Sequence, residues 1–350
     1  PTERPVHYIV WLSLPGGAES LVTAYVNHFS STREMYLYSL RPCENKLADL
    51  PEGRFQSGFE NNRECYTAYF RYCRRYRNHQ FHLVNSGPVI LLLTLLAGAR
   101  RPVYHIHGTV YWTSLLQKLY LKTAWLLSSL FQFSIIANSE HSAAVFRKKV
   151  LPKKLHIVYN GFDGDDFLKS RRKRKELRKM AYIGRFYNGK NVELTIRLFN
   201  EIAGNMPQLE LHLAGSGMLL GALQEQAANS PYRDRIKFHG WVSDIAAFYA
   251  DVDLFIFPSA HESFGNVVLE ALLTGLPVLA SELPAFREIH GGDPAFSLGD
   301  PANYEEAKAS FMRGVEQYSG LAEKAYALGE PLGARFSMEQ HLEGVGALYR

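Results

Sequence analysis

Short apolar runs alternate with helix-length amphipathic segments along almost the whole chain, and this alternation limits the possible folds. It is typical of repeated strand–helix units, in which helices cover a mainly parallel sheet. A chain of 350 residues is long for one hydrophobic core and sufficient for two α/β domains. We therefore predict an α/β protein built from two such domains.

The alternation predicts individual elements in both halves. Strands are expected at 7–12, 81–85, 102–107, 133–138, 155–159, 180–184, 210–214, 236–239, 254–258 and 277–280. Helices are expected at 18–29, 63–77, 139–148, 192–202, 218–227, 267–273, 303–315 and 338–349. The stretch 111–136 predicts an amphipathic or buried helix, because its leucines recur at helical spacing. Between Arg41 and Arg63 no clear pattern is visible.

A run of five cations, Arg171 to Lys175, interrupts the alternation. Runs of like charge resist packing, so we expect a solvated linker there, with a contact to anionic lipid as the alternative. The last residues predict an amphipathic helix that could pack on either domain. The expected organisation is a first domain at 1–165, a basic linker at 166–178, a second domain at 179–335 and a C-terminal helix at 336–350.

Composition narrows the class of protein. With 47% hydrophobic and 21% charged residues, the chain has a globular balance that argues against disorder. Its net charge of +5 suits a protein that handles anionic ligands or visits an anionic surface. Three cysteines without a CxxC pair argue against a disulfide framework and favour a cytoplasmic location. We expect neither a secretory signal nor a transmembrane span, since the most apolar run, 89–99, is too short.

The most informative stretch runs from Phe257 to Pro277 and reads as a strand end, a polar turn and a helix start. The backbone N–H groups of Phe264, Gly265 and Asn266 at that helix start suit a phosphate or carboxylate.

Two carboxylates accompany this site, since seven residues separate Glu262 from Glu270. Together they suit the hydroxyl groups of a sugar nucleotide. Taken singly, each has a simpler interpretation, a helix cap for Glu262 and a surface position for Glu270.

The whole stretch resembles the signature of the retaining family 4 glycosyltransferases, in which a Pro-Ser strand end precedes two glutamates at this spacing. The resemblance implies the GT-B fold, two facing Rossmann-like domains with a deep interdomain cleft. It also implies that Glu262 touches the transferred sugar and that Glu270 touches the ribose. The resemblance is densest from Tyr182 to Glu288, as expected for a family with a shared donor half and a variable acceptor half.

A second group of residues lies in the loop that follows Gly184, where Arg185 and Lys190 are five residues apart. Cations on such a loop can gather the oxygens of a diphosphate and stabilise its charge as it leaves. A solvated loop with ordinary basic residues is the alternative. Because the segment is similar to the family's Gly-Arg…Lys-Asn segment, we predict Arg185 and Lys190 as diphosphate ligands.

A strand that ends in Gly215 and Gly217 by itself suggests a dinucleotide fold. However, Gly221 comes one residue late for GxGxxG, and Asp234 precedes the next strand, so hydride transfer is the weaker interpretation. In the resembled family a Gly-x-Gly turn here borders the nucleotide. The resemblance places the later loop with Val242 near the base.

In the first half, Gly16 and Gly17 lie between a strand and a helix, where they permit either a close ligand approach or a tight turn. The family's first loop is also rich in glycine, which implies that both border the sugar or the diphosphate. His105 and His107 end another strand, but no third metal ligand accompanies them. His107 resembles the cleft histidine that contacts the donor sugar, and we expect a structural role for His105.

We therefore predict a metal-independent retaining glycosyltransferase that needs no cofactor and uses a nucleoside diphosphate sugar, with a UDP-sugar expected from family habit. The predicted catalytic residues are His107, Glu262, Arg185 and Lys190. The predicted donor-binding residues are Gly16, Gly17, Gly215, Gly217, Val242, Phe264, Gly265, Asn266 and Glu270. A sugar-nucleotide epimerase of the same fold and a non-catalytic sugar-nucleotide-binding protein remain alternatives.

The expected acceptor is a glycan or a lipid-linked glycan, and no nucleic acid is expected as a partner. The apolar stretch 111–131 with its lysines, and the arginines interleaved with aromatic residues at 69–77, suggest a peripheral contact at the cytoplasmic membrane face. Core packing of the first stretch and solvation of the second are the alternatives.

Overall fold

The computed structural model describes residues 4–10, 17–42, 50–51, 53–99, 102–107, 115–144, 146–148 and 150–349. It divides the chain into two compact units. The first unit comprises Pro1–Gly161 and Glu339–Arg350, and the second comprises Phe162–Met338. The C-terminal segment therefore belongs to the same unit as the N-terminal part of the chain.

The described part of the first unit contains a seven-stranded parallel sheet in the order β3-β2-β1-β4-β5-β6-β7. Its strands are β1 (Val6–Val10), β2 (Met35–Ser39), β3 (Phe55–Gln56), β4 (Gln80–Val84), β5 (Val103–Ile106), β6 (Ser134–Ala137) and β7 (Leu155–Ile157). Val6 pairs with Met35 on one side and with Gln80 on the other, so β1 is an inner strand of the sheet. Strands buried on both faces need helices on both sides.

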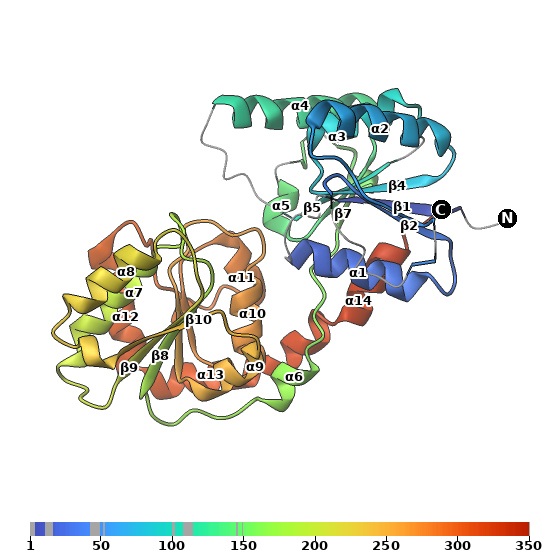
Figure 1. The fold of residues 1–350 in the computed structure, drawn as a ribbon. Coiled ribbons are helices and arrows are strands. Elements are labelled where there is room, and N and C mark those ends of the chain that lie inside the picture. The colour runs from blue at the N-terminus through green and yellow to red at the C-terminus, as the bar shows by residue number, and fades with distance from the viewer. Residues whose placement is uncertain are drawn as a thin grey trace. The chain divides into compact units, whose positions relative to one another are not determined.

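Two layers of helices cover this sheet (Figure 1). One face carries α2 (Asn62–Arg75), α3 (Gly87–Leu96) and α4 (Leu115–Phe131), and the other carries α1 (Gly17–Phe29) and α14 (Met338–Gly346). Shorter elements are α5 (Glu140–Ala144) and η1 (Pro152–Lys154). The C-terminal segment is held by hydrogen bonds of Tyr25 with His341, 2.7 Å, and of Tyr8 with Tyr349, 2.6 Å.

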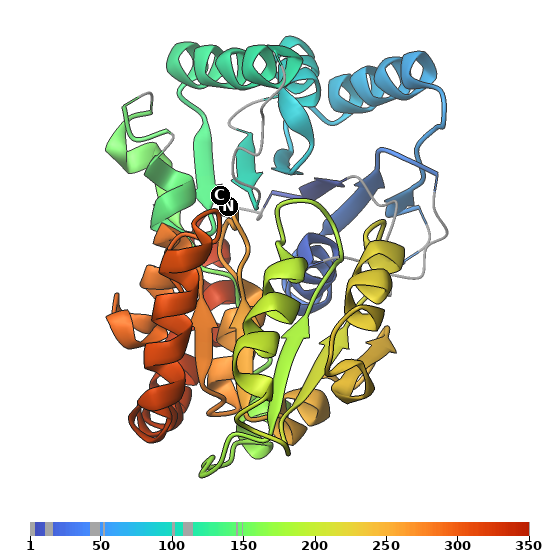
Figure 2. The ribbon, with the colours of Figure 1, turned by 90° about the vertical axis from the view of Figure 1, so that its left-hand side faces the viewer.

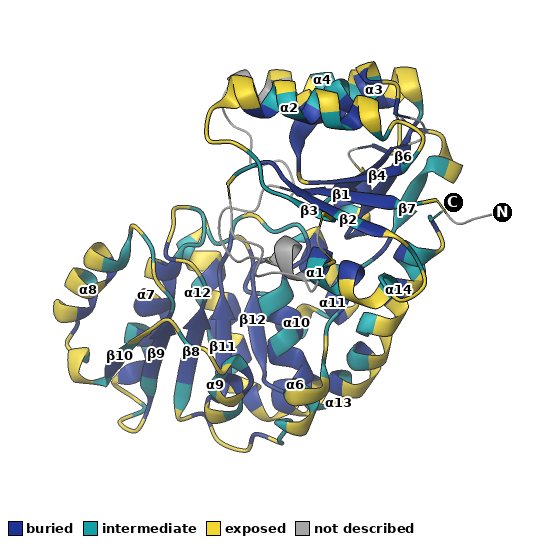
Figure 3. Cartoon of the chain, turned by 45° about the vertical axis from the view of Figure 1, so that its right-hand side comes forward, coloured by how far each residue is buried: buried dark blue, intermediate teal, exposed yellow. Residues whose placement is uncertain are grey.

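The second unit has a five-stranded parallel sheet in the order β10-β9-β8-β11-β12. Its strands are β8 (Lys179–Ile183), β9 (Glu210–Ala214), β10 (Ile236–Gly240), β11 (Leu254–Phe257) and β12 (Val278–Ala280). Its helices are α6 (Asp165–Lys169), α7 (Val192–Ala203), α8 (Leu220–Ala228), η2 (Arg233–Arg235), α9 (Ile245–Asp251), α10 (Asn266–Leu273), α11 (Pro284–His290), η3 (Pro294–Phe296), α12 (Tyr304–Glu316) and α13 (Tyr318–Arg335). Figure 2 looks onto the face covered by α7, α8 and α12, and α10 and α13 lie on the other face. In both units the inner strands are buried, the edge strands β3, β7 and β10 are partly exposed, and the helices expose their outer sides (Figure 3).

Every predicted strand and helix is present with shifts at the ends, but the helix expected at 139–148 extends only over Glu140–Ala144. Residues 11, 12, 111–114 and 145 of the predicted elements lie outside the described residues. The sequence analysis missed β2, β3, α3, α6, α9, α11 and α13. In α13, Pro331 and several glycines argue against a helix by intrinsic propensity. Packing along α10 within the second unit overrides that preference.

The basic run from Arg171 to Lys175 is solvated only in part: its three arginines are held by the second unit, whereas Lys173 and Lys175 are exposed. Arg174 is only 4% exposed, and its guanidinium donates hydrogen bonds to the carbonyl oxygens of Tyr249 and Thr274. Arg171 lies over the ring of Tyr326 at 3.9 Å. A guanidinium has five donors in one plane, so it can satisfy several carbonyl groups where helices end. Among the described residues, no helix combines the length and the apolar content that crossing a bilayer demands.

Candidate functional site

The strand order of the second unit reverses at one place. From β8 the chain proceeds to β9 and β10 on one side, whereas β11 and β12 lie on the other side of β8. Parallel sheets of this kind bind ligands beyond the carboxyl ends of the two strands where the order reverses. The loops after β8 and β11 contain the two segments that the sequence singled out, 184–191 and 258–265.

Direct contacts join these two loops. The side-chain amide of Asn191 donates to the carbonyl oxygen of Pro258 at 2.9 Å, and the N–H of Ala260 donates to the carbonyl oxygen of Gly189 at 2.8 Å. Lys190 also forms an ion pair with Glu262, and both side chains are largely buried. The structure thus brings together a predicted diphosphate ligand and a predicted sugar ligand. An ammonium group has three donors, so Lys190 can contact an anion while it holds Glu262.

Arg185 presents the second cation of the loop after β8. Its side chain is exposed, with its guanidinium 5.6 Å from the ring centre of Tyr187, and it forms no ion pair with any described residue. A buried side chain holds its backbone in place, because the hydroxyl of Tyr182 donates a hydrogen bond to the Arg185 carbonyl oxygen at 3.2 Å. A fixed backbone with an exposed guanidinium suits an anion at the carboxyl end of β8.

Helix α10 begins at the same edge, directly after the loop that follows β11. Gly265 precedes it with φ +97°, and a Cβ atom there would lie 2.4 Å from the ring of Phe286. Glycine is therefore required for this turn into the helix. Gly265 has no side-chain oxygen that could cap α10. The partial positive charge at the start of α10 therefore favours an anion beside Asn266. The side chain of Phe264 instead packs in the interior against Phe336.

Glu270 lies on α10, where it is half-buried next to the hydroxyl of Tyr249. That hydroxyl donates to the Val267 carbonyl oxygen at 3.1 Å and lies 3.4 Å from the Glu270 carboxylate. Burial raises the pKa of Glu270 to about 7. Glu270 is therefore not a fully exposed surface residue, because its carboxyl group is half-buried and its pKa is raised. Tyr249 comes from α9, which the sequence analysis missed, and no local pattern links the two residues.

The Gly215 and Gly217 turn brings the loop after β9 against the loop after β8. A Cβ atom on Gly215 would lie 1.8 Å from the Gly184 carbonyl oxygen, and one on Gly217 would lie 2.4 Å from the Phe186 carbonyl oxygen. Both glycines thus have a structural role that spacing alone did not show. Their contact with a nucleotide stays a prediction, as does that of the half-buried Val242 after β10.

The remaining predicted site residues belong to the first unit. Gly16 lies outside the described residues, and Gly17 begins α1. His107 directly follows β5, where its backbone N–H donates to the side-chain oxygen of Asn85 at 3.0 Å. Burial lowers the pKa of His107 to about 4, so its imidazole is neutral at neutral pH. Its role as a sugar contact stays a prediction.

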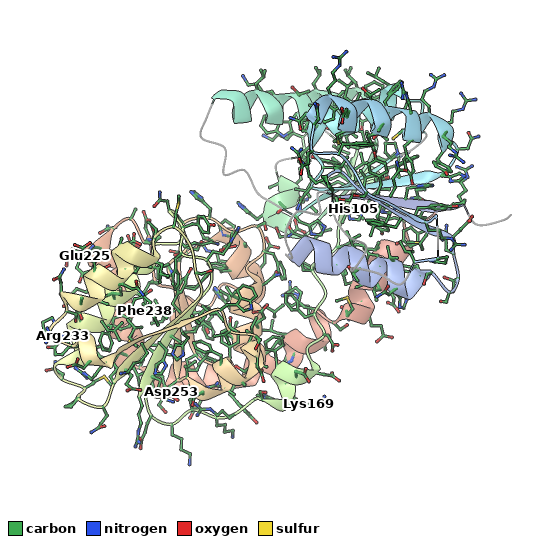
Figure 4. All side chains as sticks on the ribbon, in the orientation of Figure 1. His105, Lys169, Glu225, Arg233, Phe238 and Asp253 are labelled. Carbon is green, nitrogen blue, oxygen red and sulfur yellow. The ribbon has the colours of Figure 1, made fainter. Side chains whose placement is uncertain are left out.

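His105 is fully buried in the first unit (Figure 4) and shares a 2.8 Å hydrogen bond with His82. This placement agrees with the structural role expected for it. In the part of the chain that the structure describes, no group of three or more histidine, cysteine or carboxylate side chains could hold a metal ion.

Two family profiles match the chain. The profile described as Glycosyltransferase Family 4 matches residues 15–166, and the one described as Glycosyl transferases group 1 matches residues 178–313. Each profile lies mainly on one of the two units.

Curated relatives match over part of their length. The GDP-mannose:cellobiosyl-diphosphopolyprenol alpha-mannosyltransferase of Xanthomonas campestris is 28% identical over 56% of this chain and 53% of its own length. The lipopolysaccharide core biosynthesis glycosyltransferase LpsE of Rhizobium meliloti is 31% identical over 45% of each chain. The chain thus spans about half the length of these curated relatives.

Solved structures resemble the chain over nearly its full length. Anabaena Alr3699/HepE in complex with UDP superposes with a TM-score of 0.80 at 18% identity, covering 98% of both chains. This likeness shows the GT-B fold that the sequence predicted. With a profile match on each half of the chain and this fold, the protein belongs to the family 4 glycosyltransferases, with a group 1 glycosyltransferase domain in its second half.

Proposed function

We propose that the protein is a retaining glycosyltransferase that takes a sugar from a nucleoside diphosphate sugar and passes it to a glycan or a lipid-linked glycan. One observation carries this proposal. Arg185, Lys190 and the start of α10 lie at the carboxyl edge of the second sheet, around the place where its strand order reverses. Two cations and a positive helix end suit the two negative charges of a sugar-nucleotide diphosphate.

The proposed chemistry follows from where charge develops. As the bond between the anomeric carbon and the diphosphate oxygen breaks, negative charge grows on the leaving phosphate. Arg185 and Lys190 would stabilise that charge more in the transition state than in the ground state. The acceptor hydroxyl supplies the oxygen of the new glycosidic bond, and its proton passes to the leaving phosphate. Front-side attack with retention rests on the family resemblance, and so does metal independence.

The two carboxylates would position the donor. Glu262, held by Lys190, would accept hydrogen bonds from the transferred sugar. Glu270 would accept them from the ribose. The roles of His107, Gly16 and Gly17 in binding the sugar or the diphosphate rest on the resemblance.

A uridine donor is supported by the structurally similar Anabaena protein, which was solved with UDP. A guanosine donor is the second candidate, because the name of the Xanthomonas relative specifies GDP-mannose. The same name specifies a diphosphopolyprenol acceptor, and the Rhizobium relative acts in lipopolysaccharide core biosynthesis. Both names support a lipid-linked acceptor. Donor consumption that requires an acceptor would exclude an epimerase and a non-catalytic binding protein.

Calorimetric titration with UDP and with GDP tests the donor site. We expect one nucleotide to bind, and we expect Arg185→Ala to weaken its binding roughly 10- to 100-fold, since a charge-assisted hydrogen bond is lost. Glu270→Ala should weaken binding as well.

Arg178→Ala is the matched control, because Arg178 is exposed, lies just before the amino end of β8 and pairs with Glu176. This variant should bind the nucleotide as the unmodified protein does. If the folded protein binds neither nucleotide, the transferase proposal is wrong.

A further inference from the structure

We propose that the outer face of helices α2, α3 and α4 in the first unit is a docking surface for an anionic lipid bilayer. This surface is separate from Arg185, Lys190 and the start of α10, which lie in the second unit. Three features of the face carry the inference: a band of exposed leucines, a row of arginines that form no ion pair with a described residue, and a lysine within the band.

The apolar band begins on α4. Leu119, Leu126 and Leu130 are 60%, 58% and 66% exposed, and their spacing of seven and four residues places them on one side of the helix. The opposite side is buried through Ala124 and Leu127. The sequence analysis left open whether this stretch is amphipathic or buried. Among its described side chains, the structure shows one buried face and one exposed face that carries leucines together with Lys122.

The band continues onto α3, which packs between α2 and α4 (Figure 1). Val89 and Leu96 are exposed there, and Phe131 is exposed at the end of α4. Six of the eleven exposed large hydrophobic residues in the described part of the chain lie on these two helices. Single exposed leucines are common on protein surfaces, but a contiguous group of them marks an interaction site.

Helix α2 places positive charge beside the band. Arg71 and Arg74, together with Arg77 in the turn that follows, are exposed and form no ion pair with a described residue. The segments 62–77, 87–96 and 115–131 contain five arginines and two lysines against one glutamate, Glu64. A basic helix beside exposed leucines is the composition of proteins that lie at the interface of anionic membranes.

Charge also decides between a bilayer and a second copy of the chain. In a two-fold dimer the same patch would face itself and bring like charges together. Lys122 lies within the exposed face of α4, between Leu119 and Leu126. A lysine in this position can rest its apolar stem in the bilayer and keep its ammonium among phosphate groups. The face therefore fits an anionic bilayer better than it fits itself.

Co-sedimentation of the full chain with lipid vesicles tests this surface, without donor or acceptor. We expect binding to vesicles of phosphatidylcholine with phosphatidylglycerol and little binding to phosphatidylcholine alone, with loss of binding at about 1 M salt. The triple variant Arg71→Gln, Arg74→Gln, Arg77→Gln should weaken vesicle binding by on the order of 100-fold. The double variant Leu126→Gln, Leu130→Gln should weaken it by roughly 10-fold or more.

The charge-matched control carries Lys175→Gln, Arg233→Gln and Lys237→Gln, all exposed in the second unit, with Arg233 on the α8 side (Figure 4). It should bind vesicles as the unmodified protein does. Circular dichroism and thermal unfolding check that every variant is folded.

Equal binding to neutral and anionic vesicles, no binding to either, or equal losses in the control would overturn the proposal. A concentration-dependent dimer that the leucine variant abolishes, without vesicle binding, would assign the face to a second copy instead. None of these outcomes depends on whether the donor site binds a nucleotide.

Discussion

Glu270 shows how a neighbouring residue changes the chemistry of a side chain in the proposed donor site. Its carboxyl group is half-buried on α10, above the Tyr249 hydroxyl, and burial raises its pKa to about 7. Near neutral pH the carboxyl is therefore divided between its neutral and ionised forms. Only the ionised form is a pure hydrogen-bond acceptor for two ribose hydroxyls.

This pKa predicts how donor binding depends on pH. Affinity for the sugar nucleotide should fall roughly tenfold between about pH 8 and about pH 6, because the ionised acceptor is lost as Glu270 gains a proton. A sugar nucleotide is the right probe, since its esterified phosphates do not titrate in this range. Calorimetric titration along the pH series measures the effect.

Glu270→Gln keeps the size of the side chain and removes the titration, so its affinity should be nearly independent of pH across this range. An unchanged pH profile in this variant would show that another group is responsible.

At the scale of elements, the site depends on loops that approach each other closely at the carboxyl edge of the second sheet. The N–H of Phe186 donates to the Ser216 carbonyl oxygen at 2.8 Å, which ties the loop after β8 to the loop after β9. Gly215 has φ +133° and leaves no space for a Cβ atom beside Gly184. The position of the Arg185 loop therefore depends on a glycine in a different loop.

Gly215→Ala should lower the free energy of unfolding by about 3 kcal/mol, because the new methyl group overlaps a carbonyl oxygen and the backbone is strained. It should also weaken nucleotide binding by moving Arg185. Chemical denaturation and calorimetric titration measure the two effects.

Gly221→Ala is the control in the following helix, α8, where an added Cβ atom meets nothing within 4 Å. It should raise stability by up to about 1 kcal/mol, since alanine favours the helix. If Gly215→Ala and Gly221→Ala change the free energy of unfolding and nucleotide binding equally, the close approach at Gly215 does not explain why glycine stands there.

The elements themselves were largely predictable from the sequence, because period and apolar content are local properties. The strands β8, β9, β10, β11 and β12 and the loops that carry Arg185 and Glu262 were all expected. Helix α13 was not expected, because Pro331 argues against a helix by local propensity. Packing against α10 stabilises this helix, and that contact is not visible in the local sequence. The position of Tyr249 below Glu270 was not predictable either, because it depends on how α9 and α10 meet.

At the scale of the whole molecule, the two units differ in how many histidines they bury in their interiors. In the first unit, burial lowers the pKa of His82 to about 3 and that of His341 to about 4, and it also lowers that of His105 well below its usual value. Unfolded histidine titrates near 6.5, so below that pH the unfolded state binds protons that the folded unit excludes. Stability is therefore full above about pH 6.5 and falls as pH decreases towards about 4.

Acid should open the first unit before the second. We expect amide protection in β4 and β5 to decrease between about pH 7 and about pH 5, after correction for the intrinsic exchange rate, with β8 and β11 as internal controls. Hydrogen–deuterium exchange with mass spectrometry measures both units in one sample. Equal losses in the two units would contradict a role for the buried histidines.

The sequence by itself determined the alternation of strands and helices, the cations and glycines of the donor loops, and the family. These follow from local period, backbone geometry and motif spacing, which neighbouring residues carry. Only the tertiary structure decided that Arg174 is buried and that the C-terminal segment completes the first unit. It also decided that the leucine face of α4 is exposed and that Glu270 titrates near neutral pH. Burial and pKa depend on which distant segments pack against a residue, and no local pattern contains that information.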